Sequence, residues 1–201
     1  MLIDTASIKW CLSKSAEIHE IYKLNYLNSD SSIRSVNNLL DLCRKFLNKN
    51  IELFIHEDSH LSHGVKGFLV TTGDGYQICL LDEQNNCWKR FVLCKELFHV
   101  ILDEERFRNV SLIDHIEDFT AGLIDKDHHS CDSAQSEILA EISAMEFLFP
   151  YSDRKVLLNN AEQVHFMDIA ERYKIPRFYV ERYLSDRMME ALDPDRLAEI
   201  E

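Results

Sequence analysis

The sequence predicts an α+β fold that is mostly helical and contains a small antiparallel or mixed sheet. Helices are indicated where apolar residues recur three and four positions apart, as between Ser35 and Leu47 and, less regularly, between Ser15 and Leu27. Strands are indicated by short β-type runs at Ile51 to His56, Lys66 to Thr72 and Tyr76 to Leu81. The turn signal Gly73-Asp74-Gly75 lies between the last two runs and predicts a hairpin.

Further helices are expected in the second half of the chain, at about Trp88 to Asp103, Ser133 to Phe149, Phe166 to Tyr173 and Arg177 to Leu192. Asp132 or Ser133 is a suitable N-cap for the second of these, and Pro150 ends it. The segment from Glu104 to Ser130 is acidic and irregular. Because the chain shows no repeat and no linker composition, one domain over residues 1–201 is expected.

The composition is that of a folded chain with an acidic balance. Of the 201 residues, 46% are apolar and 10% aromatic, which argues against a disordered chain. The net charge of −13 argues against direct nucleic-acid binding, because phosphate contacts need clustered Lys and Arg. It favours partners that are neutral or basic. The sequence indicates no oligomeric state.

The cysteines and the hydropathy pattern favour a cytoplasmic protein. The six cysteines form no CxxC pair, and no signal peptide is visible. No apolar run reaches the roughly 20 residues that a membrane span needs. We therefore expect reduced thiols, most of them packed in the core.

The predicted helix from Trp88 to Asp103 carries polar residues on an otherwise apolar surface. Its apolar residues surround it almost completely, which indicates burial. Yet Lys95, Glu96, His99 and Asp103 fall within an arc of about 100°. Ionisable side chains on a buried stripe are costly unless they are paired, bind a ligand or line a cleft. This helix is therefore the first candidate for a functional site.

The spacing within this stripe matches part of a zinc-binding motif. In HExxH, two histidines four residues apart share a zinc ion, and the Glu activates the bound water. Glu96 and His99 hold the second and last positions, but Lys95 stands at the first, and a protonated Lys has no lone pair for a metal. On these residues alone, a solvated or locally salt-bridged cluster remains the alternative to a functional site.

Three blocks of the sequence resemble the ImmA/IrrE metallopeptidase family, in the same order. The first is a Gly67-Phe68 strand and then RFVLCKELFH at 90–99, similar to the family's R-F-T-L-A-H-E-L-G-H. The second is EILAEISAMEFLFP at 137–150, similar to E-x-x-A-x-x-F-A-x-x-L-L-M-P. The third, MDIAERYKIP at 167–176 followed by VERYL at 180–184, is similar to the L-A-x-x-F-x-V-S…V-x-x-R-L ending.

The resemblance implies a fold and a set of site residues. It covers about 51–187 and implies a zincin-like metallopeptidase core there, with N-terminal helices at 1–50 and a C-terminal tail at 188–201. By resemblance, His99 and Glu137 are zinc ligands and Glu96 is the general base. Lys95 and Phe98 depart from the usual His and Gly. Because one of three protein ligands is missing, zinc is expected to be absent or weakly bound.

Other residues are weaker candidates for a site. Glu141, one turn after Glu137, could offer a second carboxylate, although a solvated helix face is the expected environment. The stretch from Ile169 to Leu184 could be mistaken for a helix-turn-helix, but the acidic chain argues against DNA reading. Polar loops are expected for two histidine groups, namely His56-His60-His63 and His128-His129 with Asp125, Asp127 and Cys131.

Three functional hypotheses follow. In the first, the chain is a pseudo-peptidase that binds a protein partner, by resemblance a DNA-binding repressor in bacterial or phage regulation, and Lys95 takes the electrostatic place of the metal. In the second, it is an active zinc endopeptidase of altered ligation, using Glu96, His99, Glu137 and either Asp103 or a loop histidine. The third is an unrelated helical binding protein.

Both leading hypotheses depend on one geometric expectation. The helix that bears Lys95 and His99 should pack beside the helix that bears Glu137, with the charged groups of Lys95 and Glu137 within about 4 to 6 Å. A solvated cluster would leave these two residues on separate surfaces.

Overall fold

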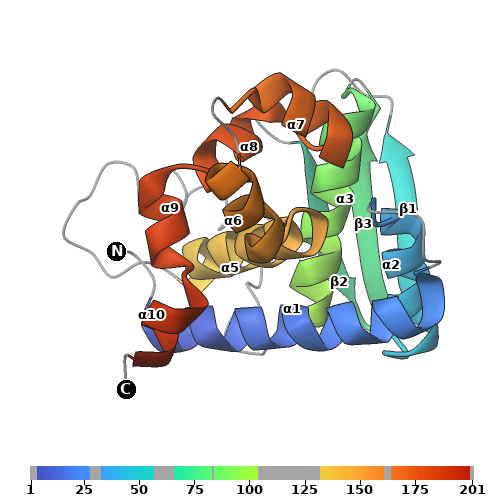
Figure 1. The fold of residues 1–201 in the computed structure, drawn as a ribbon. Helices are drawn as coiled ribbons and strands as arrows, with labels where there is room; N and C mark the ends of the chain where they lie inside the picture. Colours follow the sequence, from blue (N-terminus) through green and yellow to red (C-terminus); the bar gives the residue numbers. More distant parts are fainter. Residues whose placement is uncertain are drawn as a thin grey trace, which may run out of the picture.

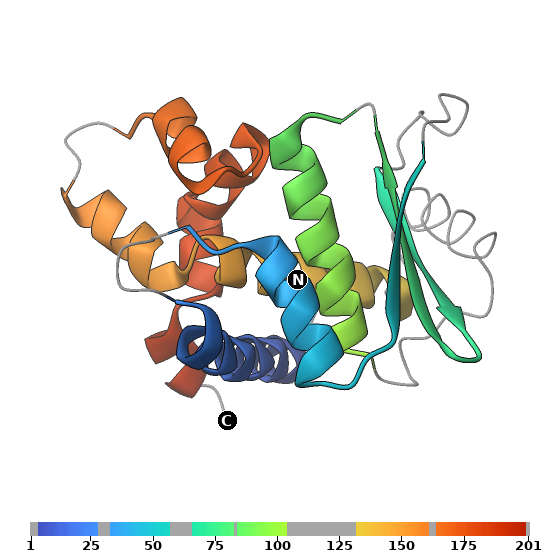
Figure 2. The same ribbon diagram turned by 90° about the vertical axis from the view of Figure 1, so that its right-hand side faces the viewer.

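The computed structural model describes residues 4–27, 33–56, 66–82, 84–103, 132–160 and 164–199. In this part of the chain, helices pack against a small mixed sheet (Figure 1). Figure 2 shows α3 between the strands and the C-terminal helices. The predicted α+β class, mostly helical with a small sheet, is confirmed.

The described sheet has the order β1-β3-β2, with bounds β1 Ile51–His56, β2 Gly67–Thr72 and β3 Gly75–Leu81. β2 and β3 form the predicted antiparallel hairpin, and β1 pairs with β3 in parallel. Glycine is needed at position 75 because a Cβ there would collide with the carbonyl oxygen of Asn50. At Gly67 a Cβ would press on Val92, so β2 lies close against α3.

The first helix, α1 (Thr5–Tyr26), begins ten residues earlier than the predicted start at Ser15. Asp4 caps it, since Asp4 Oδ1 accepts a hydrogen bond of 2.7 Å from the Ser7 backbone N–H. Its buried stripe contains polar side chains, which hid the periodicity in the sequence. Ser15 is buried but donates to the Cys11 carbonyl at 2.8 Å, so its hydroxyl is satisfied.

The core lies where α1, α2 (Val36–Lys45), α3 (Asn86–Ile101) and α5 (Asp132–Leu148) meet. Asn85 caps α3, because its side-chain oxygen accepts from the Trp88 backbone N–H at 3.1 Å. α3 contacts α2 and α5 as well as β2 and β3. This position buries α3 as expected and leaves its polar stripe turned toward α5.

The C-terminal part is more finely divided than the sequence predicted. It contains α6 (Tyr151–Asn160), α7 (Phe166–Tyr173), α8 (Arg177–Tyr183), α9 (Asp186–Ala191) and α10 (Pro194–Glu199). The predicted single helix from Arg177 to Leu192 was wrong, because Ser185 caps a new helix by accepting from the Met188 N–H. α6 and α10 were not predicted.

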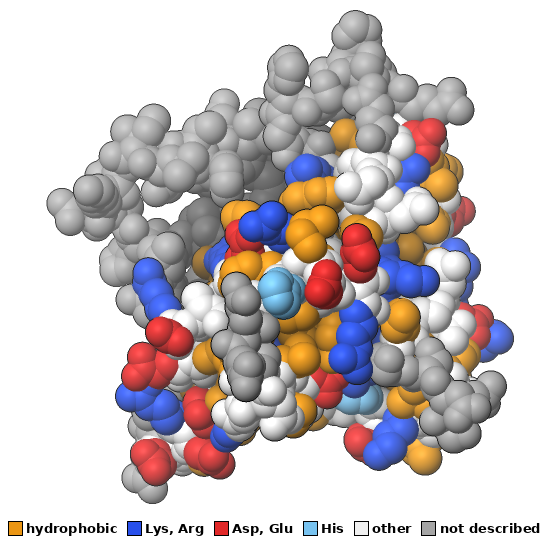
Figure 3. All heavy atoms as spheres, turned by 45° about the horizontal axis from the view of Figure 1, so that its top comes forward, with side chains coloured by type: hydrophobic (Ala, Val, Ile, Leu, Met, Phe, Trp, Pro, Cys, Tyr) orange, Lys and Arg blue, Asp and Glu red, His pale blue; other side chains and the backbone are white. Residues whose placement is uncertain are grey.

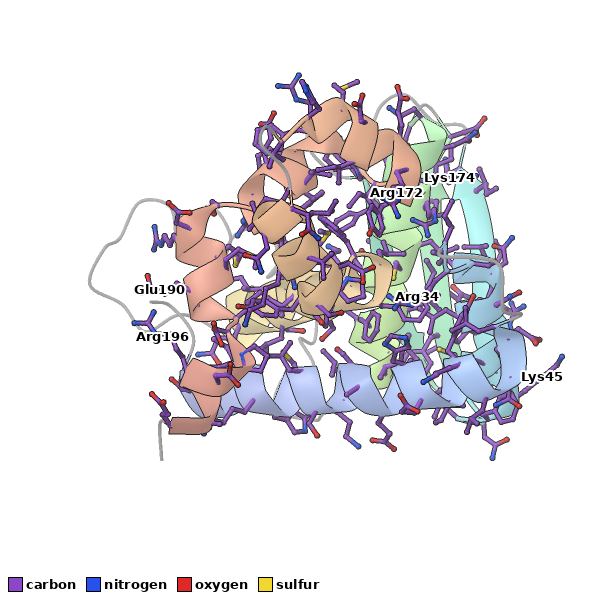
Figure 4. All side chains as sticks on the ribbon, viewed as in Figure 1. Arg34, Lys45, Arg172, Lys174, Glu190 and Arg196 are labelled. Carbon is purple, nitrogen blue, oxygen red and sulfur yellow. The ribbon has the colours of Figure 1, made fainter. Side chains whose placement is uncertain are left out.

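Arg90 joins the end of α7 to the first half of α3, and Arg34 joins the segment before α2 to α1 and α5. Arg90 of α3 donates to the Tyr173 carbonyl at 2.7 Å and to the Lys174 carbonyl at 3.1 Å, at the end of α7. It also donates to the Arg34 carbonyl at 2.5 Å. The Arg34 guanidinium donates to the Phe147 carbonyl and lies 3.0 Å from His19 Nε2. Figure 4 labels Arg34. These contacts hold α7, and α8 after it, over the first half of α3.

Three of the described thiols lie in the core, whereas Cys79 and Cys87 are partly exposed. Cys11, Cys43 and Cys94 are free and buried, and burial raises the pKa of Cys11 and of Cys43 to about 12. None of the described helices is long and apolar enough to span a membrane.

Candidate functional site

The ammonium group of Lys95 lies between the carboxylates of two helices. Its Nζ atom donates to Glu137 Oε2 of α5 at 2.7 Å and lies 3.3 Å from Glu96 Oε1 of its own helix. The expected proximity of Lys95 and Glu137 is therefore confirmed. A solvated cluster would have left these two residues on separate surfaces, but only 19% of the Lys95 side chain is exposed. The local salt bridge that the sequence also allowed, between Lys95 and Glu96, is present.

His99 joins the same cluster from the next turn of α3. Its Nδ1 atom lies 3.1 Å from Ser136 Oγ, and this contact turns Nε2 toward Glu137 Oε1, also 3.1 Å away. Although the two atoms are close, their geometry is not that of a hydrogen bond. The buried Nε2 therefore has no hydrogen-bond partner among the described residues. Glu96 Oε1 is also buried without a hydrogen-bond partner among the described residues, although it forms an ion pair with the Lys95 ammonium at 3.3 Å.

The charges of the cluster depend on one another. Burial alone would lower the pKa of Lys95, but the negative charges of Glu96 and Glu137 outweigh it and raise the pKa above its ordinary value. Burial alone would raise the pKa of Glu137, but His99 and Lys95 outweigh it and hold the pKa below its usual range. Lys95 is thus a firmly protonated cation that holds Glu137 as a carboxylate.

Glu96 is the most enclosed member, with 3% of its side chain exposed, whereas Glu137 keeps 46% exposed. An enclosed carboxylate is strongly disfavoured without a cation nearby. The negative charge of Glu96 therefore depends on Lys95 more strongly than that of Glu137, because water can still hydrate the Glu137 carboxylate.

Glu141 continues the polar face of α5, and the expected solvated environment was wrong. Its Oε1 atom accepts a hydrogen bond of 3.1 Å from the Tyr183 hydroxyl and lies 3.0 Å from Arg182 Nη1. Burial raises the pKa of Glu141, although Arg182 and Tyr183 oppose the shift. Glu141 thus fixes the end of α8 against α5, one turn from Glu137.

Tyr179 is a further neighbour of the cluster that sequence reasoning missed. It lies one turn before Tyr183 on α8, and its ring stacks on Phe91, one turn before Lys95, with centroids 3.8 Å apart. Burial, with the charge of Glu141 added, raises the pKa of Tyr179 to about 12. The only signal in the sequence was the aromatic character of Phe178-Tyr179 beside the VERYL block.

The remaining candidates do not join this cluster in the described structure. The side chain of Asp103 accepts a hydrogen bond from the Tyr76 hydroxyl of β3. His56 ends β1 and is exposed. The other histidine candidates, His60, His63 and His128-His129 with Asp125, Asp127 and Cys131, lie outside the described residues, as does the acidic 104–130 segment.

Among the described residues, the donor set of a catalytic zinc site is incomplete. Such a site needs three protein ligands and an open position for water. His99 Nε2 and Glu137 could supply two donors, but no three His, Cys, Asp or Glu side chains of the described ranges are grouped to hold a metal. The protonated Lys95, which has no lone pair to offer, already contacts the Glu137 carboxylate that a metal would bind.

A protein-family model matches more than half of the chain. A helix with Glu and His in the HExxH register, beside a second helix that brings a carboxylate to them, is the arrangement of a metallopeptidase-like domain. The model of the family Peptidase_M78, described as the IrrE N-terminal-like domain, matches residues 48–185, and the chain belongs to this family.

Among solved structures, a Mycobacterium tuberculosis transcriptional regulator is similar, with 12% sequence identity and a TM-score of 0.49. The alignment covers 84% of this chain and 45% of the regulator, so this chain spans less than half of that protein's length. A comparison with curated proteins found no match.

Proposed function

We propose that this chain is a metallopeptidase-like regulatory protein that acts by binding a protein partner and not by hydrolysing it. The observation that carries the proposal is the position of Lys95 Nζ, 2.7 Å from Glu137 Oε2 and 3.3 Å from Glu96 Oε1. By resemblance, this is the place of the first zinc ligand. A fixed ammonium there compensates both carboxylates and keeps the two helices together without a metal.

The family resemblance suggests the class of partner. It implies recognition of DNA-binding transcriptional repressors, and the net charge of −13 favours a neutral or basic partner. We place this activity in the cytoplasm, in keeping with the free thiols of the described core.

An active zinc endopeptidase of altered ligation is the second candidate. It is favoured by Glu96 Oε1 and His99 Nε2, which are buried without hydrogen-bond partners among the described residues. Unpartnered buried polar atoms are rare and are a known feature of catalytic sites. In that case Glu96 would act as the general base.

The test uses a partner captured from an extract of the source cells. Capture should weaken in Glu137→Gln, which alters the half-exposed carboxylate of the cluster, and should be unchanged in Glu17→Gln. Glu17 is an exposed residue of α1, which lies away from α8 in Figure 1.

The captured partner is then incubated with the parent protein and with Glu96→Gln, each with added zinc. We expect an intact partner in both reactions. Fragments formed by the parent but about 10²- to 10⁴-fold more slowly by Glu96→Gln would establish the peptidase instead, because loss of a general base has that effect.

A further inference from the structure

An aromatic surface adjoins the cluster of Lys95, Glu96, His99 and Glu137, called here the Lys95 cluster. Trp88, Phe91 and Lys95 follow one face of α3 at spacings of three and four residues. The ring of Tyr179 stacks on Phe91 and meets Trp88 edge to face, with centroids 5.7 Å apart. Phe178 extends the surface by an edge contact of 5.2 Å to Tyr179. We call Trp88, Tyr179 and Phe178 the aromatic platform.

The platform is open to a partner. Phe178 keeps 57% of its surface exposed, so part of the aromatic platform faces solvent. Trp88 and Tyr179 are half-buried. Figure 3 turns the top of Figure 1, where α7 and α8 lie, toward the viewer, and hydrophobic side chains appear there among acidic and basic ones.

A cation already rests on the platform. Lys66 Nζ lies 3.7 Å from the centroid of the Trp88 ring, well within the distance at which a cation is attracted to an aromatic face. Lys66 is exposed and precedes β2, where its backbone carbonyl accepts from the Leu81 N–H. Its long side chain can therefore leave the ring while the backbone stays in place.

The basic side chains of α3 and α8 beside the platform are paired with carboxylates. Lys89 pairs with Asp82, and Arg177 pairs with Glu181. In the neighbouring cluster, Lys95, Arg182 and the imidazole of His99 face the three carboxylates Glu96, Glu137 and Glu141. The whole chain carries −13, so its long-range field also attracts basic segments.

We propose that the aromatic platform binds an arginine side chain from a basic segment of a protein partner. In the free protein Lys66 occupies this binding site, and the arginine of the partner displaces it. Arginine suits the site because its planar guanidinium stacks on aromatic rings and is weakly hydrated. The inference rests on the proposed function, since it places the partner next to the Lys95 cluster.

The test measures binding of a fluorescein-labelled peptide, acetyl-Gly-Arg-Gly-Arg-Gly-amide, by fluorescence anisotropy. We expect Lys66→Met to bind it about fivefold more tightly than the parent, because removing the internal cation frees a contact worth roughly 1 kcal/mol. The same peptide with citrulline in place of arginine keeps the shape but loses the charge. It should bind more weakly and should not respond to Lys66→Met.

Lys49→Met is the matched control. Lys49 Nζ lies 5.4 Å from the Tyr76 ring, at the opposite end of β3 from Leu81, so this change removes the same charge and the same kind of contact elsewhere. It should leave the difference between the arginine and citrulline peptides unchanged. Trp88→Leu, checked for folding by circular dichroism, should abolish that difference.

Equal tightening in Lys66→Met and Lys49→Met would overturn the inference and leave only general charge attraction. Equal binding of the arginine and citrulline peptides would also overturn it, because the charge of the guanidinium would then contribute nothing. If Trp88→Leu does not fold, the comparison of Lys66→Met with Lys49→Met still decides. Neither result affects the proposed function, which is tested by Glu137→Gln capture and by the integrity of the captured partner.

Discussion

Replacing Lys95 with histidine is expected to give the protein a zinc site. The new imidazole would join His99 and Glu137 and complete three protein ligands. His99 is already oriented for this, because the contact of Nδ1 with Ser136 Oγ turns Nε2 toward Glu137. We expect one zinc per chain and an affinity at least about 100-fold above that of the parent, since metal affinity depends steeply on deprotonated ligands. Zinc titration by calorimetry measures it.

Two further variants locate the ligands. Lys14→His adds a histidine on the exposed surface of α1 and should not raise zinc affinity. The double variant Lys95→His with Glu137→Gln should lose the gain. If Lys95→His titrates like the parent, Glu137 is not placed to share a metal with the α3 face.

Replacing Lys95 with methionine is expected to destabilise the fold. The change leaves Glu96, with 3% of its side chain exposed, without its cation. Removing one partner of a buried ion pair lowers the free energy of unfolding by about 3 kcal/mol. Water can hydrate the half-exposed Glu137 carboxylate after the change, but it cannot reach the enclosed Glu96 in the same way. The urea midpoint of unfolding should fall accordingly.

The matched control is Lys14→Met, which removes a lysine from an exposed pair with Glu17 and should unfold close to the parent. Adding Glu96→Gln to Lys95→Met should recover part of the loss, because the amide carries no charge to compensate. An unchanged midpoint for Lys95→Met would show that Glu96 does not depend on the ammonium.

The centre of the site could be predicted because its constraints are local. Lys95, Glu96 and His99 share one face of a helix that is otherwise apolar, so the sequence alone shows ionisable groups that need a partner. The 137–150 block then named the helix that supplies it. The expected proximity of Lys95 and Glu137 rested on the polar stripe and on the family resemblance of that block, and the two groups are observed 2.7 Å apart.

The surroundings of the site could not be predicted because they depend on packing between distant segments. Glu141 looked like a solvated residue until α8 brought Arg182 and Tyr183 against it. Tyr179 reaches the cluster only because Arg90 holds the end of α7 over α3. No pattern within one element encodes such contacts.

Missed helices have a similar physical cause. α6 carries Arg154, a fully buried arginine that forms an ion pair with Glu146 at 2.5 Å. The buried face of α6 therefore lacks the apolar pattern by which a helix is predicted. The stripe of α1 includes the buried serines Ser7 and Ser15 for the same reason. Periodicity of apolar residues fails where polar side chains find partners inside the fold.

The zinc content of the purified parent protein tests the central claim most directly. The protein is loaded with zinc, dialysed against zinc-free buffer and analysed for metal per chain. Because Lys95 holds its proton and contacts both Glu96 and Glu137, we predict well under one equivalent. One equivalent that resists dialysis would contradict the account and establish a metal centre of altered ligation.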